Sequence, residues 1–148
     1  MPLRSNLYFF RNRRFFKFTL ESLVDLIVCR FQIFFVPYEK WRPDYCVFQS
    51  ETMRDEPVGY RAVVRDVRRS VLWVAKWVPW RSKCLDQALA AQRMLNRRGF
   101  STTLYLGMAR DESNAWVAHA WVRCGKAWVV GYQPNQTYAV VATYAKMG

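Results

Sequence analysis

The stretch VPWRSKCLDQALAAQRMLNRRG, residues 78–99, contains the start and end signals of one helix with a cysteine near its beginning. Ser82 is a favourable N-cap, and Asp86 suits the positive end of the helix dipole. Apolar residues recur at helical spacing up to Gly99, which ends the helix. Cys84 is then expected at the second helical position, where unpaired backbone N–H groups and the dipole favour the thiolate. Cys84 is therefore a candidate nucleophile, and a small buried packing residue is the alternative.

Length, charge and cysteine content limit the possible classes of protein. The 148 residues suit one domain, and a hydrophobic content of 52% is sufficient for a core. A net charge of +12 predicts a positive surface that attracts nucleic acid, anionic lipid or an acidic protein. Four widely spaced cysteines and one histidine supply too few ligands for a zinc cluster, so we expect no metal and no cofactor. We find no signal peptide and expect a cytoplasmic protein.

The first 60 residues are expected to contribute an amphipathic helix and a connecting loop to the same structural unit as the rest. Aromatic and basic residues alternate in LYFFRNRRFFKF, residues 7–18. This segment fits a membrane or nucleic-acid surface, but we favour the start of the next helix and its core. Thr19 offers a cap for that helix. Residues 38–59 have mixed charge with proline and glycine, which indicates a loop.

The expected amphipathic helix, LESLVDLIVCRFQIFF, has acidic and apolar residues on different sides. Glu21 and Asp25 fall on one side. The apolar side carries Leu20, Val24, Ile27 and Phe31. Charged residues interrupt the run, which argues against a membrane span and leaves peripheral membrane contact open.

A second helix is expected from Arg61, because valines recur at spacings of three and four between arginines. It ends before Pro79 after a short connection, so Trp77 and Trp80 are expected between this helix and the cysteine helix. After Gly99 the period changes to alternation, which predicts four strands. These are residues 103–107, 115–124, 127–130 and 137–144. Helices followed by an antiparallel meander predict an α+β domain whose cysteine helix packs on the sheet.

His119 lies in the middle of the second expected strand. Alternation puts His119, Trp121 and Arg123 on one face of this strand. A single histidine on an apolar strand is usually a hydrogen-bonded core residue. A cysteine at a helix start followed by a strand histidine is also what cysteine hydrolases need, because the imidazole takes the thiol proton and later protonates the leaving amine.

These residues resemble a known family. WRSKCLDQALAAQRMLNRRGFSTTLYLGM, followed by AHAWV, is similar to the standalone leader peptidases of lasso-peptide biosynthesis, members of the transglutaminase-like cysteine protease superfamily. The resemblance implies a papain-like core over residues 61–148, with Cys84 as nucleophile and His119 as general base and acid. It also implies a cytoplasmic endopeptidase that removes the leader from a ribosomally made lasso precursor peptide. A separate leader-recognition protein and an ATP-dependent lasso cyclase are the implied partners, and no nucleic acid is expected.

One position departs from the superfamily pattern. An aspartate usually follows on the next strand and holds the imidazole, but here the segment reads VVGYQPNQ and contains no carboxylate. The amide of Gln133 or Asn135 could hold the ring instead, or a backbone carbonyl could. Asp86 and Asp111 are better explained as helix-start and turn residues.

Two other functions remain open from the residues. An acyl-enzyme on Cys84 can be resolved by an amine instead of water, as in transglutaminases. The basic and aromatic segments also fit a binding module for a membrane surface or nucleic acid, whose binding would weaken steeply with salt.

Overall fold

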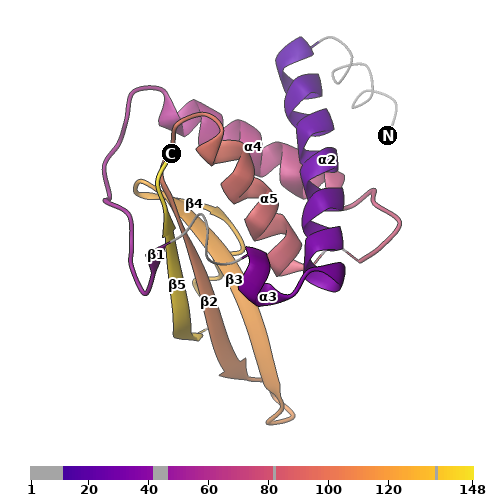
Figure 1. Cartoon of the computed structure of the whole chain (residues 1–148), viewed down its shortest axis with the longest axis vertical. Helices are drawn as coiled ribbons and strands as arrows, with labels where there is room; N and C mark the ends of the chain where they lie inside the picture. Colours follow the sequence, from indigo (N-terminus) through magenta and orange to yellow (C-terminus); the bar gives the residue numbers. More distant parts are fainter. Residues whose placement is uncertain (1–11, 42–46, 82, 136) are drawn as a thin grey trace.

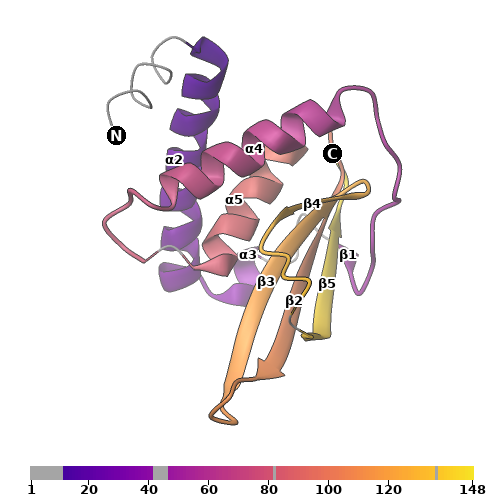
Figure 2. The same cartoon turned by 180° about the vertical axis from the view of Figure 1, so that it is seen from behind.

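The computed structural model describes residues 12–41, 47–81, 83–135 and 137–148. It consists of a five-stranded antiparallel sheet with α4 and α5 packed on one face, and α2 on the far side of these two helices (Figures 1 and 2). The helices are α2 (Arg13–Phe35), α3 (Tyr38–Trp41), α4 (Tyr60–Val74) and α5 (Cys84–Asn96). The expected α+β class, with a cysteine helix on an antiparallel sheet, is confirmed.

The strands are β1 (Val47–Phe48), β2 (Thr102–Arg110), β3 (Trp116–Cys124), β4 (Ala127–Val130) and β5 (Ala139–Lys146). Their order in the sheet is β1-β5-β2-β3-β4. Strands β2, β3 and β4 form the expected meander. The last strand is an exception, because β5 returns to pair with β2 instead of β4. In that place Ala142 and Tyr144 of β5 reach the hydrophobic core.

The region expected to be a loop, residues 38–59, also contains regular structure. It includes α3 and the short edge strand β1, which pairs with β5 through Val47 and Ala145. The expectation of a loop throughout this region was therefore wrong. The local sequence at Val47 and Phe48 does not predict a strand. These two residues form one because the open edge of β5 supplies partners for their backbone hydrogen bonds.

Helix α2 begins earlier than expected. Asn12 caps it by accepting a hydrogen bond from Phe15 N at 3.2 Å, and Thr19 lies inside the helix, where its hydroxyl donates to Phe15 O. Phe15 and Phe18 are buried, which confirms that this part of the aromatic segment starts the helix and its core. Phe16 is exposed, and residues 7–11 lie outside the described residues.

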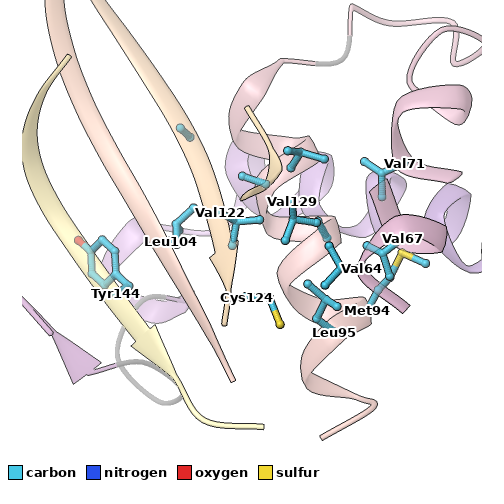
Figure 3. Close-up of a cluster of buried hydrophobic side chains, with 14 of the residues drawn as sticks. Val64, Val67, Val71, Met94, Leu95, Leu104, Val122, Cys124, Val129 and Tyr144 are labelled. Atoms are coloured by element: carbon cyan, nitrogen blue, oxygen red, sulfur yellow. The ribbon is translucent and has the colours of Figure 1, made fainter. Parts of the chain in front are cut away.

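The core lies between the sheet and the two helices α4 and α5. Valines of α4 face apolar residues of α5 and of the strands, as the close-up in Figure 3 shows. The fully buried members include Val67, Val71, Met94, Leu95, Val122 and Val129.

A second, smaller cluster joins the three long helices. It consists of Leu26, Cys29, Val74 and Ala90, and Trp80 packs against it as expected. Trp77 does not lie between the helices: it is 71% exposed and its ring contacts that of Trp73. Helix α4 ends at Val74, and the turn that follows directs Trp77 outward.

Within the described part of the chain, no helix combines the length and the apolar content that crossing a bilayer requires.

Candidate active site

Cys84 is the first residue of α5, one position earlier in the helix than expected. Lys83 is the N-cap residue, and Ser82, the expected cap, lies outside the described residues. Asp86 accepts a hydrogen bond from Lys83 N at 2.9 Å, which confirms its role at the helix start. The Asp86 side chain is buried, and Arg30 Nη1 of α2 lies 3.7 Å from its Oδ2. Local capping and a contact from α2 together hold the backbone that carries Cys84.

The three described cysteines are all free thiols in different environments. Burial raises the pKa of Cys29 from 9.0 to about 12, and burial with a smaller effect of Asp55 raises that of Cys124 to about 11. Both therefore remain protonated and unreactive near neutral pH. Cys84 is half-buried at the helix start, where backbone N–H groups have no helical partner. Of the described thiols, Cys84 alone has the setting of a nucleophile.

The ring of His119 on β3 is held on both its edge and its face. Its Nε2 forms a hydrogen bond with the backbone oxygen of Gly131, just beyond β4. The ring lies against those of Tyr138 and Trp121, with centroid separations of 4.9 and 6.0 Å. A carbonyl oxygen only accepts hydrogen bonds, so Nε2 carries a proton and the neutral ring has its lone pair on Nδ1. This is the tautomer that can take a proton from a thiol.

Glycine is required at position 131 for this contact. Its φ of +83° is in the left-handed region, and a Cβ there would lie 2.3 Å from the backbone oxygen of Ala120. The chain can therefore pass close to β3, and this close approach brings the Gly131 carbonyl to the imidazole.

The described partner of the His119 ring is this carbonyl. Gln133 and Asn135 are exposed further along the same loop, and among the described residues no hydrogen bond joins either of them to His119. Of the sequence-based alternatives for holding the ring, the backbone carbonyl is the one present here. Asp111 is a turn residue as expected, because its Oδ1 accepts hydrogen bonds from the backbone N–H groups of Ser113 and Ala115.

The structure does not bring Cys84 and His119 together, because their side chains lie on opposite faces of β3. Ala120 and Val122 belong to the core cluster on the helix side of the sheet, and Cys84 packs against that cluster. Alternation along β3 puts His119 and Trp121 on the other face. In the described structure no hydrogen bond joins Cys84 to His119.

Sequence reasoning missed the polar network beside His119. Arg123, on the same face of β3, is completely buried, and its guanidinium donates to Tyr105 Oη at 3.0 Å and to Thr52 O at 2.8 Å. Tyr105 Oη in turn donates to Glu51 at 2.9 Å. The network anchors the segment around residue 51 on the outer face of the sheet. Alternation signalled that Arg123 shares the face of His119, but nothing local signalled its burial.

Comparison with protein families places these residues in a known group. The model described as the transglutaminase-like superfamily matches residues 42–143, which include α4, α5, Cys84 and His119. Comparison with curated proteins and with solved structures gives no match. Members of the superfamily are generally cysteine proteases and transglutaminases. Because the match covers more than half of the chain, this protein belongs to the transglutaminase-like superfamily.

Proposed function

We propose that the protein is a cysteine endopeptidase that removes the leader from a ribosomally made lasso precursor peptide. The observation that carries the proposal is Cys84, a half-buried free thiol at the start of a helix packed on a sheet, inside a transglutaminase-like domain. The finer assignment to lasso-peptide maturation is supported by the resemblance of residues 80–108 and 118–122 to the leader peptidases of that pathway. Cleavage would free the core peptide's N-terminal amine for an ATP-dependent cyclase.

In the proposed reaction, Sγ of Cys84 attacks the carbonyl carbon of the scissile bond, and the thiol proton passes to Nδ1 of His119. His119 then gives this proton to the leaving amine, which releases the core peptide. Water attacks the acyl-enzyme and returns Cys84 with a new carboxylate on the leader. The bond from Nε2 to Gly131 keeps Nδ1 available, and the backbone N–H of Cys84 can donate to the developing oxyanion.

The proposal requires Cys84 and His119 to approach each other when substrate binds. Their side chains lie on opposite faces of β3 in this structure, so the approach requires a rearrangement of β3 or of the start of α5 and not only the shortening of a hydrogen bond. The carbonyl of Gly131 would serve as the fixed point about which the imidazole is oriented.

The first test concerns Cys84. Brief treatment of the full chain with iodoacetamide, followed by peptide mass spectrometry, should label Cys84 before Cys29 and Cys124, whose raised pKa values keep them protonated. Cys84→Ala should abolish cleavage of a lasso precursor supplied with its leader-recognition protein, and the matched variant Cys124→Ala should retain it. Cleavage by Cys84→Ala at the wild-type rate would refute the mechanism.

The second test concerns His119. Loss of a general base should lower the cleavage rate of His119→Ala by several orders of magnitude while the protein stays folded. A core histidine would behave differently: its loss would cost about 1–3 kcal/mol of stability, and activity would follow the folded fraction. Melting temperature and cleavage rate measured on one preparation decide between these roles. Gln133→Ala and Asn135→Ala are the controls and should change the rate little, because the ring already has a backbone partner.

The third test separates hydrolysis from acyl transfer and measures the need for a partner. Precursor is incubated with the enzyme, with and without the leader-recognition protein, in the presence of methylamine. A peptidase gives a free carboxylate on the leader and is accelerated by the partner. A methylamide as the main product would identify a transferase, and full leader-selective activity without the second protein would remove the proposed partner.

A further inference from the structure

The outward face of α2 is apolar along almost its whole length. Large exposed side chains recur over about 24 Å of helix, from residue 20 to residue 35, with exposed fractions that reach 72% at Phe35. This apolar stripe consists of Leu20, Val24, Ile27, Phe31, Phe34 and Phe35. Contiguous apolar surface of this extent marks an interaction site.

The charged residues on the exposed side of α2 are of one sign. Both acidic residues of α2 are turned away from it: Glu21 pairs with Arg98, and Asp25 pairs with Arg93. The outward face begins with exposed Arg13 and Lys17. Further along, the guanidinium of Arg30 lies over the ring of Phe34, 4.5 Å from its centroid. The stripe therefore begins beside the exposed positive charges of Arg13 and Lys17, on a chain whose net charge is +12, whereas the charge of Arg30 is shared with Asp86.

We propose that α2 docks the protein on an anionic phospholipid surface, with the apolar stripe in the interfacial layer and the basic residues at the headgroups. Helices that lie in the membrane interface combine an apolar face with bordering lysine and arginine. Each basic residue near an anionic bilayer adds about 1 kcal/mol of attraction, a fivefold gain in binding. This inference does not depend on the proposed proteolysis.

Shape and chemistry favour lipid over a protein partner. Helix α2 is the outermost helix of the fold, on the far side of α4 and α5 from the sheet (Figures 1 and 2). The stripe has no side chain able to form a hydrogen bond, whereas protein interfaces normally carry one for every 100–200 Å² or so. Acyl chains and headgroups need only apolar area and positive charge, and α2 offers both.

Flotation of the full chain with phosphatidylglycerol vesicles and with phosphatidylcholine vesicles tests the proposal. Wild type should float with phosphatidylglycerol and bind phosphatidylcholine much more weakly. The double variant Ile27→Ser/Phe31→Ser should lose about tenfold or more in affinity, because it removes two large apolar contacts. The matched control is Val58→Ser, which removes an exposed apolar side chain outside α2 and should bind as wild type does.

A second pair of variants tests the charges without changing the apolar stripe. Arg13→Gln/Lys17→Gln should weaken binding about fivefold for each charge removed. Lys126→Gln, at the β3–β4 turn, removes the same charge elsewhere and should have the smaller effect. All these positions are exposed, so melting temperatures should stay close to that of wild type.

Four results would overturn the proposal. Three concern flotation: wild type does not float, the double variant floats as wild type does, or wild type binds phosphatidylcholine and phosphatidylglycerol equally. The fourth is a protein that binds no vesicles and forms a dimer in sedimentation, which Phe31→Ser dissociates. The last result would assign the stripe to contact between copies of this chain. If Ile27→Ser/Phe31→Ser failed to fold, the charge variants would decide alone.

Discussion

Helices α2 and α4 both combine apolar and charged residues but differ in what they expose. Helix α4 buries valines such as Val67 and exposes arginines such as Arg65. Helix α2 buries Asp25, whose side chain is only 3% exposed, and turns Ile27 and Phe31 outward. An amphipathic helix usually buries its apolar stripe against the core and exposes polar residues. Helix α4 follows that rule, whereas α2 buries Phe18 and Leu26 and is apolar on its exposed side as well.

The difference comes from what each helix packs against. Helix α4 faces the apolar core of the sheet. Helix α2 packs on α4 and α5, and the end of α5 presents Arg93, Arg97 and Arg98 toward it. Glu21 and Asp25 pair with these three arginines, and the guanidinium of Arg98 also lies over the ring of Phe18. Ion pairs and the buried contacts of Phe18 and Leu26 together determine the inward side of α2, and the exposed apolar side is left for another surface.

The largest expected effect on stability comes from removing the carboxylate of Asp25 in α2. Asp25→Ala should lower the free energy of unfolding by about 3 kcal/mol, because it removes the shared partner of Arg93 and Arg97. Both arginines are partly exposed, so the loss of stability is at the lower end of the range for breaking a buried ion pair. Urea unfolding measures it, and Asp25→Asn, which keeps an oxygen acceptor, should lose less. A midpoint equal to that of wild type would show that the ion pairs do not orient α2.

A smaller effect is expected on the apolar side of α4. Val67→Ala removes two methyl groups from a completely buried site and should cost about 2 kcal/mol. Arg65→Gln, on the exposed side of the same helix, is the control and should stay within about 0.5 kcal/mol of wild type. The same urea series measures both, and equal losses would mean that α4 is not packed as described.

The smallest expected effect is a pH dependence of stability that arises from Glu21 of α2. Burial opposes ionisation of Glu21, but hydrogen bonds from Arg98 and Arg97 outweigh it and hold the pKa of Glu21 below 4.5. Its contribution is therefore complete above 4.5 and is lost as pH falls through the lowered value in the folded state. Melting temperatures measured from neutral pH downward should fall less steeply for Glu21→Gln than for wild type. An identical slope would contradict this linkage.

Local signals in the sequence were sufficient to predict the three long helices and the strands β2 to β5, and to make Cys84 a candidate. Hairpin chemistry at Gly125 predicted β4 with the limits that the structure has, since a tight turn and alternation are properties of adjacent residues. The start of α5 was predicted to within one residue, since capping also depends on near neighbours. The same signals made Cys84 a candidate before any tertiary contact was known.

Other features depended on residues far apart in the chain. Strand β5 lies beside β2 because pairing there buries Ala142 and Tyr144 in the core. The sequence of β5 alone does not indicate which strand it pairs with. The partner of His119 could not be chosen among Gln133, Asn135 and a carbonyl, because it depends on how closely the chain at Gly131 approaches β3.

The sequence by itself determined that residues 20–35 form a helix with an acidic and an apolar side, because helical periodicity is a property of consecutive residues. Only the tertiary structure decided which side faces inward. That choice rests on the burial of Phe18 and Leu26 and on three arginines at and just beyond the end of α5, whose charges reach Glu21 and Asp25 only after α2 and α5 have packed. Periodicity defines the faces of a helix, and long-range electrostatic and apolar contacts decide what each face meets.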